Sequence, residues 1–408
     1  MGINEALEPL QTIVKTMINQ QLQQIIAEAD RIAFSDFAGE GANEFVRQTP
    51  LRVQKEKIRG RGAALNPPGR FENYAQSQFD DGWDYDEPLE PLQTTVEVEK
   101  AHSIITHNTS PDIVFDCSIN PYRGCEHGCV YCYARPTHAY MGLSSGIDFE
   151  TRLFVKPDAA KILEREISKS NYKPKTIFIG TNTDPYQPIE KKWQIMRQIV
   201  EVLDRANHPL CIVTKSALVV RDIEILARMA EKKLIRVALS ITTLDRRLAR
   251  SLEPRASTAK RRLWAVKQLS SMGIPVSVIV APIIPGLNDH ELEAILKEAK
   301  SAGAVNASYI ILRLPYEVAP LFKDWLLREY PDRYRRVMQL LRDMRGGKDY
   351  DANWRSRMCG EGVYAKLISN RFRIAKQQLG LNRDTMKLST AGFVPPLACA
   401  KQLSFSFE

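Results

Sequence analysis

The sequence contains no run of about 18 apolar residues, and its N-terminus lacks the basic segment and apolar stretch of a secretory leader. It has seven cysteines, an odd number that cluster unevenly rather than suggesting a disulfide framework. A second Cys-x2-Cys pair, which a four-ligand zinc module normally uses, is also missing. These absences exclude the membrane-spanning and disulfide-rich secreted classes, so we expect a cytoplasmic protein with no membrane partner.

Charge is distributed unevenly along the chain. Residues 1–100 carry 10 Lys/Arg against 17 Asp/Glu, whereas residues 101–408 carry 47 against 31. The basic excess is densest in 328–383, with 14 basic and 6 acidic side chains. Aromatic residues are interleaved there, among them Tyr334, Trp354, Tyr364 and Phe372. Such a stretch is typical of a protein that binds DNA or RNA, although a solvated helix face with arginine stems covering apolar surface has the same composition.

We divide the chain into four parts. Residues 1–34 have apolar positions at helical spacing and form an amphipathic helical segment. Residues 35–110 are rich in Gly, Pro, Asn and acidic side chains, which predicts either an extended arm draped over the main domain or a disordered linker. In this arm, Arg61 and Arg70 stand beside glycines and would hold a phosphate or a loop of the core. Residues 111–345 form the core, and 346–408 a basic C-terminal extension.

Short apolar runs of β type alternate with amphipathic helical segments throughout the core. The predicted strands are 113–118, 176–180, 211–214, 235–241, 276–281 and 308–312. The predicted helices are 157–169, 191–205, 220–232, 258–272, 289–302 and 320–342. Six βα units in a row predict an α/β fold, a partial (β/α)6 TIM-like barrel with parallel strands and right-handed crossovers. Ligands of such sheets bind at the carboxyl ends of the strands.

Three cysteines follow the first predicted strand, in the stretch Cys125-Glu-His-Gly-Cys129-Val-Tyr-Cys132. Three thiolates are one fewer than a closed four-coordinate iron or zinc site uses. The vacant position would be open to a substrate or cofactor, which indicates a chemical rather than a structural role. Alternatively, His127 within the loop would complete a Cys3His zinc site, and the chain would then be a zinc-stapled nucleic-acid-binding protein.

The Cys-x3-Cys-x2-Cys loop after the first of six βα units, with Tyr131 before the last cysteine, resembles the radical S-adenosylmethionine (radical SAM) superfamily. The resemblance covers about 111–345. Within that superfamily, the stretches 117–135 and 180–190 are similar to the group related to spore photoproduct lyase. The upstream segments Gly60-Arg-Gly-Ala63 and Asn66-Pro-Pro-Gly-Arg-Phe-Glu72 further resemble the PA0069-type radical SAM proteins.

This resemblance implies a cofactor set and residues that hold it. Cys125, Cys129 and Cys132 would bind three irons of a [4Fe–4S] cluster, whose fourth iron binds S-adenosyl-L-methionine. A flavodoxin- or ferredoxin-type reductant would supply the electron that cleaves this cofactor to methionine and a 5′-deoxyadenosyl radical. Polar residues at strand ends resemble positions that hold the methionine or ribose of the cofactor: Thr183, Asp184, Lys215 and Ser240. Each of them would equally cap a helix or satisfy a turn.

Candidates for returning a hydrogen atom to the substrate lie near and beyond the cysteine loop. Tyr131 and Tyr133 flank Cys132 and resemble tyrosines with this role in the photoproduct lyases, with packing against the cluster as the alternative. The segment 180–184 holds no cysteine where those lyases carry a hydrogen donor, so we do not expect repair of spore photoproduct by the same relay. Cys359, in a glycine-flanked loop among arginines, is the candidate thiol on the substrate side.

The resemblance and the basic charge together predict a radical SAM enzyme that acts on nucleic acid, as a lyase in repair or as a modifying enzyme. A radical SAM enzyme for a protein or small-molecule substrate is the alternative. Separately, the tail resembles the short peptides that bind the bacterial sliding clamp, through residues 402–407, unless it is simply a frayed end.

Overall fold

The structure is a computed structural model, and it describes residues 58, 60–71, 93–113, 115–354, 356–382 and 387–396. The predicted helical segment 1–34 and the predicted clamp-binding tail 402–407 lie outside the described residues.

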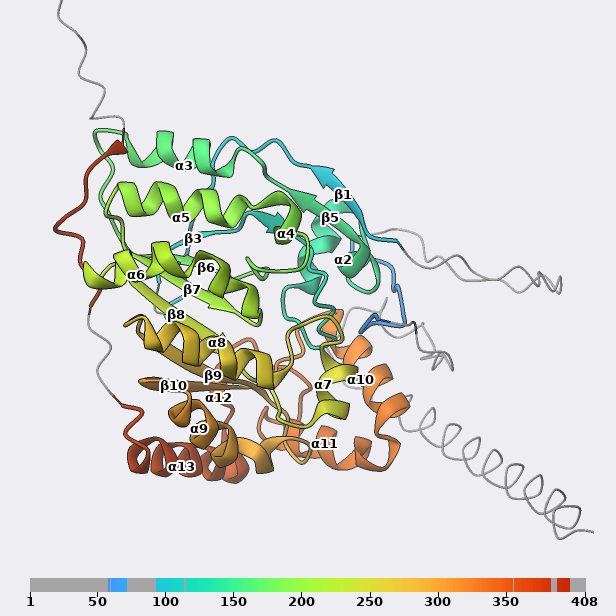
Figure 1. Ribbon diagram of the computed structural model, residues 1–408. Coiled ribbons are helices and arrows are strands. Elements are labelled where there is room, and N and C mark those ends of the chain that lie inside the picture. The colour runs from blue at the N-terminus through green and yellow to red at the C-terminus, as the bar shows by residue number, and fades with distance from the viewer. Residues whose placement is uncertain are drawn as a thin grey trace, which may run out of the picture. The chain divides into compact units, whose positions relative to one another are not determined.

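A seven-stranded sheet forms the centre of the described chain (Figure 1). Its order is β10-β9-β8-β7-β6-β3-β2, and all neighbours are parallel except β2 and β3. The strands are β2 (Ile105–His107), β3 (Cys117–Ile119), β6 (Ile177–Ile179), β7 (Leu210–Thr214), β8 (Ile235–Ser240), β9 (Val276–Ile283) and β10 (Asn306–Ile311). The six parallel strands follow each other in space as they do in sequence, which confirms the prediction of a partial TIM-like barrel built from six βα units.

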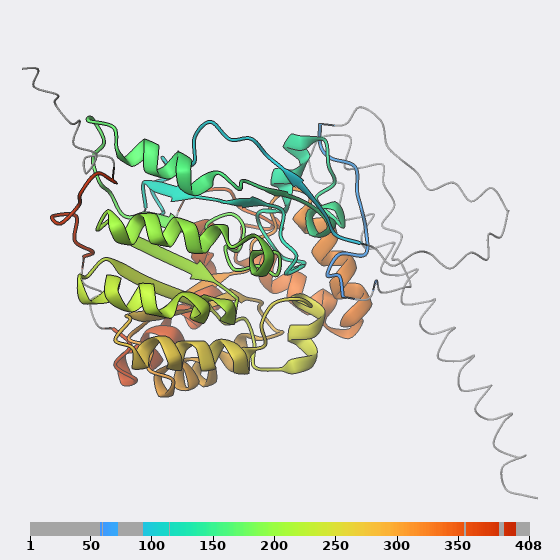
Figure 2. The ribbon, with the colours of Figure 1, turned by 45° about the horizontal axis from the view of Figure 1, so that its top comes forward.

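Amphipathic helices cover one face of this sheet (Figures 1 and 2). The longer ones are α3 (Ala159–Ile167), α5 (Ile195–Arg205), α6 (Ile223–Glu231), α8 (Ala259–Ser271) and α9 (Leu292–Ser301). Three more helices follow them: α10 (Val318–Glu329) and α11 (Pro331–Asp343), which pack against each other, and α13 (Gly362–Gln378), which packs against α9 and β10. The apolar stripe of α5 is typical, because Ile195, Ile199 and Leu203 are buried at the spacing of successive helical turns. The core therefore lies between the helices and the sheet.

Several predicted elements differ from the structure. The helix predicted for 191–205 is α4 (Glu190–Trp193) and α5, separated by Gln194 in a left-handed conformation. The first strand begins at Cys117 rather than at residue 113, because Ile113 closes a turn by donating its N–H to Ser110 O. The single helix predicted for 320–342 is two helices, α10 and α11. Pro331 begins α11 and has no N–H for continuing α10, so the chain changes direction at Tyr330.

The C-terminal part of the chain joins the same core. Ile368, Phe372 and Ala375 of α13 are buried. The Phe372 ring packs on Tyr309 of β10, with centroids 4.7 Å apart. The short helix α12 (Ser356–Cys359) lies next to β10 and pairs across to the other edge of the sheet through Arg357 and Asp112, 2.5 Å apart.

A second, three-stranded sheet lies beside the cysteine loop, and two of its strands come between β3 and β6 in the sequence. It has the order β1-β5-β4, with β1 (Thr95–Val98) parallel and β4 (Tyr122–Arg123) antiparallel to β5 (Arg152–Val155). Short helical turns complete the fold: η2 (Arg135–Met141), α2 (Asp148–Thr151), α4 (Glu190–Trp193), η3 (Ala217–Asp222), α7 (Arg246–Leu252) and η4 (Asp289–Glu291). Among the residues described, no helix is long and apolar enough to span a membrane.

Gly180 ends β6 in a left-handed conformation, with φ of +94°, and a Cβ built there would lie 1.9 Å from Val213 O. We expect Gly180→Ala to lower the free energy of unfolding by about 3 kcal/mol or more, since it adds a backbone clash to an unfavourable φ. Gly142 is the matched control, with φ of +64° and open space around it. Gly142→Ala should cost about 1 kcal/mol. Urea denaturation measures both, and equal losses would contradict this account.

Candidate active site

The three cysteines lie on one loop that follows β3 and β4 at the carboxyl end of the sheet. Cys125 and Cys129 are buried, and Cys132 is half-buried. Cys125 and Cys132 pack with Ala134 and Phe149 in a small cluster of their own. The Cys125 N–H also donates to Phe149 O at 2.9 Å. The loop is thus held by its backbone, and Cys129 and Cys132 lie close enough to Cys125 to add to the rise of its pKa.

Burial raises the pKa of the Cys125 thiol well above its usual range, with nearby Asp184 adding to the effect. Burial likewise raises the pKa of Cys129 to about 12. Burial alone would lower the pKa of Lys215, but the neighbouring Cys129 and Glu253 outweigh it, so the pKa of Lys215 is raised. Deprotonated thiols therefore need positive charge to be stable here. A cationic iron–sulfur core would supply it, so the three thiols fit such a group.

The donor set does not favour a Cys3His zinc site. His127 is buried and its Nδ1 lies 3.5 Å from Asp184 Oδ2, so the imidazole is turned toward that carboxylate. Among the described residues, no three His, Cys, Asp or Glu side chains converge closely enough to hold a single metal ion. A spaced histidine pair is another common half of a zinc site, and the chain contains one, His102 and His107. His107 lies on β2, where its Nδ1 is 3.6 Å from Cys117 Sγ.

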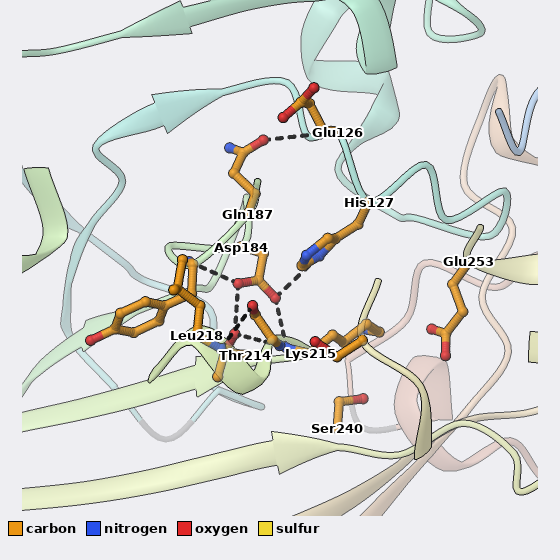
Figure 3. A network of polar contacts seen from close by, with 12 residues as sticks. Glu126, His127, Asp184, Gln187, Thr214, Lys215, Leu218, Ser240 and Glu253 are labelled. Carbon is orange, nitrogen blue, oxygen red and sulfur yellow. Dashed lines mark hydrogen bonds and ion pairs between the residues drawn. The ribbon is translucent and has the colours of Figure 1, made fainter. Parts of the chain in front are cut away.

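Asp184 connects the cysteine loop to two strand ends (Figure 3). Its carboxylate accepts from Thr214 Oγ1 and the Lys215 N–H, both at 2.6 Å. It also accepts from the Tyr186 N–H at 2.9 Å and lies beside His127. The segment after β6, the end of β7 and the cysteine loop are therefore tied together by one largely buried side chain.

Two neighbours of Asp184 hold the cysteine loop from the same segment. Gln187 accepts from the Glu126 N–H at 2.9 Å and donates to Gly124 O at 3.2 Å. The Thr183 hydroxyl donates to Tyr122 O at 3.0 Å. Because these contacts use polar groups on both sides of Cys125, the loop has little freedom to shift relative to β6.

Tyr131 belongs to a buried polar network under the loop. Its hydroxyl donates to Glu253 Oε2 at 2.6 Å, and the other oxygen of Glu253 pairs with Arg262 at 2.6 Å. Burial raises the pKa of Tyr131 well above its usual range, with Cys129 and Glu253 contributing. The ammonium of Lys215 lies 5.8 Å from the centre of the Tyr131 ring. Arg262 also donates to the carbonyl of Ser240, which places the end of β8 at this network.

Comparison with known proteins decides the family. Residues 119–299 match the model of the radical SAM superfamily. An uncharacterized protein of Mycobacterium tuberculosis is 35% identical over 230 residues, which are 56% of this chain and 68% of that protein. The chain belongs to the radical SAM superfamily. Members of this superfamily use a [4Fe–4S] cluster and S-adenosylmethionine, in agreement with the donor set of the loop.

Two further likenesses refine the description of the fold. Spore photoproduct lyase, solved in complex with dinucleoside spore photoproduct, is 17% identical with a TM-score of 0.51, over 70% of this chain and 79% of that one. A protein of Pseudomonas phage M6, named a radical SAM Nalpha-GlyT isomerase, is 23% identical over 56% of this chain and 46% of its own. The fold is thus that of a radical SAM enzyme similar to spore photoproduct lyase. The narrower PA0069-type assignment stays a prediction.

The structure brings most of the predicted site residues of this radical SAM chain together. Thr183, Asp184, Lys215 and Ser240 lie at the ends of β6, β7 and β8, around the cysteine loop. Tyr133 is 45% exposed, and its hydroxyl donates to Thr181 O. Cys359 lies apart from them. It is exposed on α12, where it interacts with the Tyr309 hydroxyl of β10.

Residues 61–63 of the arm form a clamp on α2, next to the cysteine loop. The sequence predicted this contact only in outline. Glu150 is fully buried on α2 and accepts from the N–H groups of Gly62 and Ala63, at 3.0 and 2.9 Å. Arg135 pairs with the same carboxylate at 2.5 Å and donates to Cys129 O at 2.9 Å. Arg61 donates to Glu150 O at 2.9 Å. Residues 60–71 therefore pack on the main domain, and Arg61 contacts α2, the helix whose Phe149 carbonyl holds the Cys125 N–H.

The predicted basic surface of 328–383 is partly neutralised. Four of its arginines pair with carboxylates: Arg328 with Asp324, Arg342 with Asp349, Arg357 with Asp112 and Arg371 with Glu293. Two of its interleaved aromatics, Tyr334 and Phe372, are buried, so they offer no stacking surface. The sequence density of arginine in this stretch thus overstates the charge that it presents to a phosphate backbone.

Gly62 lies directly against the cysteine loop, since a Cβ there would stand 1.8 Å from Gly128 O. We expect Gly62→Ala to displace the loop and to weaken retention of iron by about tenfold or more, as loss of an outer-shell support does in metal sites. Gly60→Ala is the control, because nothing lies within 4 Å of a Cβ at Gly60. Iron and sulfide per chain after anaerobic reconstitution measure the effect. Equal iron content in both variants would show that the packing of Gly62 on the loop does not support iron binding.

Proposed function

We propose that this radical SAM protein reductively cleaves S-adenosylmethionine and uses the resulting 5′-deoxyadenosyl radical on a nucleic-acid substrate, as a repair-like lyase or a modifying enzyme. The observation that supports it most is the loop of three thiols at the carboxyl ends of the parallel strands, beside a buried lysine. A flavodoxin- or ferredoxin-type reductant would deliver the electron. We place the enzyme in the cytoplasm, where thiols stay reduced.

The chain would divide the work of holding the cluster and cofactor among its strand ends. Cys125, Cys129 and Cys132 would bind the cluster. Lys215, whose ammonium lies over Tyr131 beside the thiols, would bind the carboxylate of S-adenosylmethionine. Ser240 donates its proton to Ala281 O and keeps lone pairs for a ribose hydroxyl.

Two of the strand-end residues would act indirectly. Thr183 and Asp184 are occupied by the chain's own groups, so their proposed role is to fix the loop and the Lys215 backbone rather than to touch the cofactor.

A nucleic-acid substrate is supported by charge and by likeness of fold. The chain has a formal net charge of +9, which favours a polyanionic partner. The structural neighbour was solved with a dinucleoside lesion, and this chain shares its fold. A protein or small-molecule substrate is the second candidate, and the ion-paired arginines of 328–383 favour it, since they lessen the basic surface.

Tyr133 is the better placed of the two tyrosines for returning a hydrogen atom. Its ring is partly exposed and lies under the guanidinium of Arg313, 4.6 Å from the ring centre. Tyr131 is buried and committed to Glu253. Cys359 interacts with Tyr309, and we keep it as a thiol that acts only if the substrate extends to the β10 edge.

The reductive cleavage is tested by scoring 5′-deoxyadenosine from the anaerobically reconstituted protein with dithionite. Wild type should form it, and Cys129→Ala should lose essentially all formation because one cluster ligand is gone. Cys211→Ala is the matched control, since Cys211 is a buried cysteine on β7. DNA and RNA added with deuterium at the sugar or base positions should pass the label to 5′-deoxyadenosine. A fully loaded cluster that forms no 5′-deoxyadenosine would falsify the proposal.

The two tyrosines should respond differently to loss of the hydroxyl. Tyr131→Phe should lower the free energy of unfolding by about 1–3 kcal/mol, because it removes a donor from the buried Glu253 carboxylate. Tyr133→Phe should cost about 1 kcal/mol or less, since it loses one hydrogen bond at a partly exposed site. Tyr133→Phe should also lower severalfold the amount of product formed from the substrate per 5′-deoxyadenosine. Thermal unfolding and product analysis separate the effects, and a normal product ratio in Tyr133→Phe would remove its proposed role.

A further inference from the structure

Three exposed aromatic rings surround one arginine near the cysteine loop. The guanidinium of Arg70 lies 4.8 Å from the ring centre of Phe71, 5.0 Å from that of Tyr140 and 4.5 Å from that of Tyr316. The rings of Phe71 and Tyr140 also contact each other, with centroids 5.2 Å apart. We call these four side chains the aromatic platform.

The platform is assembled from three distant parts of the chain that all border the site. Phe71 belongs to the arm, Tyr140 to η2 after the cysteine loop, and Tyr316 to the segment between β10 and α10. Figure 2 places the arm beside α10, on the side toward which the central strand arrows point. Tyr316 is three residues from Arg313, so their Cα atoms lie within about 11 Å. Arg313 itself covers Tyr133, the neighbour of Cys132.

Docking of the arm does not explain why these rings are exposed. Phe71, Tyr140 and Tyr316 are 58%, 71% and 68% exposed. Rings that served only to attach the arm would be buried by that attachment. Tyr316 also adopts a left-handed conformation, with φ of +48°, which costs a non-glycine residue about 1 kcal/mol. Large exposed rings in an unfavourable backbone geometry mark a binding surface.

Charge indicates what the platform would bind. Arg70 Nη1 donates to both carboxylate oxygens of Glu317, at 3.0 and 3.1 Å. Its charge is therefore compensated, and its flat guanidinium adds to the stacking surface instead of presenting a phosphate site. The chain as a whole is basic. A neutral, flat aromatic surface on a basic protein suits the bases of a polyanion rather than its phosphates.

We propose that the aromatic platform stacks an unpaired nucleotide base next to the one that enters the barrel. This proposal rests on the nucleic-acid substrate proposed above and adds where the strand lies. Base stacking requires the nucleotide to be single-stranded or turned out of a duplex. The platform would thereby favour unpaired DNA or RNA over an intact duplex, and it would hold the nucleic-acid strand near the cysteine loop.

Affinity for a fluorescein-labelled, mixed-sequence single-stranded 12-mer of DNA tests the platform. Fluorescence anisotropy at fixed salt should give a dissociation constant about tenfold weaker for Tyr316→Ala and for Tyr140→Ala than for wild type. Tyr316→Phe should bind like wild type, because it keeps the ring. The slope of log affinity against log salt should not change, since stacking releases no counterions.

Trp264→Ala is the matched control. Trp264 is also exposed and lies under an arginine, Arg261, at 4.2 Å, but it is on α8. It should bind the 12-mer like wild type. A 12-mer containing 2-aminopurine adds a direct readout, since its fluorescence should be quenched on binding to wild type and less so with Tyr316→Ala.

The outcomes separate this proposal from the proposed function. If wild type binds the 12-mer and neither alanine variant changes its affinity, the platform is overturned and the nucleic-acid substrate stands; a peptide or another segment of the chain would then be its occupant. If wild type binds no oligonucleotide even at low salt, both are overturned. If Trp264→Ala weakens binding as much as Tyr316→Ala, the effect is not specific to the platform and the proposal falls.

Discussion

The largely buried carboxylate of Asp184 is the constraint on which the geometry of this site depends. It accepts from a strand-end hydroxyl and two backbone N–H groups while lying beside the imidazole of His127. A carboxylate removed from water is costly unless donors surround it, so it fixes every element that supplies one. Through it, the cysteine loop is placed at the ends of β6 and β7.

The opposite side of the loop depends on a second buried carboxylate, that of Glu150. Its partners come from the arm and from Arg135, and Arg135 in turn reaches Cys129 O. Residues 60–63 of the arm are therefore part of the site. The close approach of Gly62 to Gly128 leaves no room for any side chain between the two backbones. A radical SAM site needs such rigidity, because its cofactor chemistry depends on orientation and on exclusion of water.

Substrate recognition looks different in three dimensions than along the chain. The arginines of 328–383 suggested a phosphate-binding surface, but several pair with carboxylates of the same chain, such as Arg357 with Asp112 and Arg371 with Glu293. The exposed aromatic surface lies instead on the arm, η2 and the segment after β10. Composition reports how many charges a segment has, whereas only packing decides which of them face water.

The sequence by itself determined the six βα units, the order of the strands and the loop that carries Cys125, Cys129 and Cys132. These follow from periodicity and spacing, which are local properties of the chain. The tertiary structure alone decided that Glu150 and Glu253 are buried partners of the loop, that Arg61 donates to the carbonyl oxygen of Glu150, and that Tyr131 and Tyr133 differ in exposure. Such pairs join residues 15 to 122 positions apart. No local pattern encodes them, because a buried charge finds its partner through the packing of the whole core.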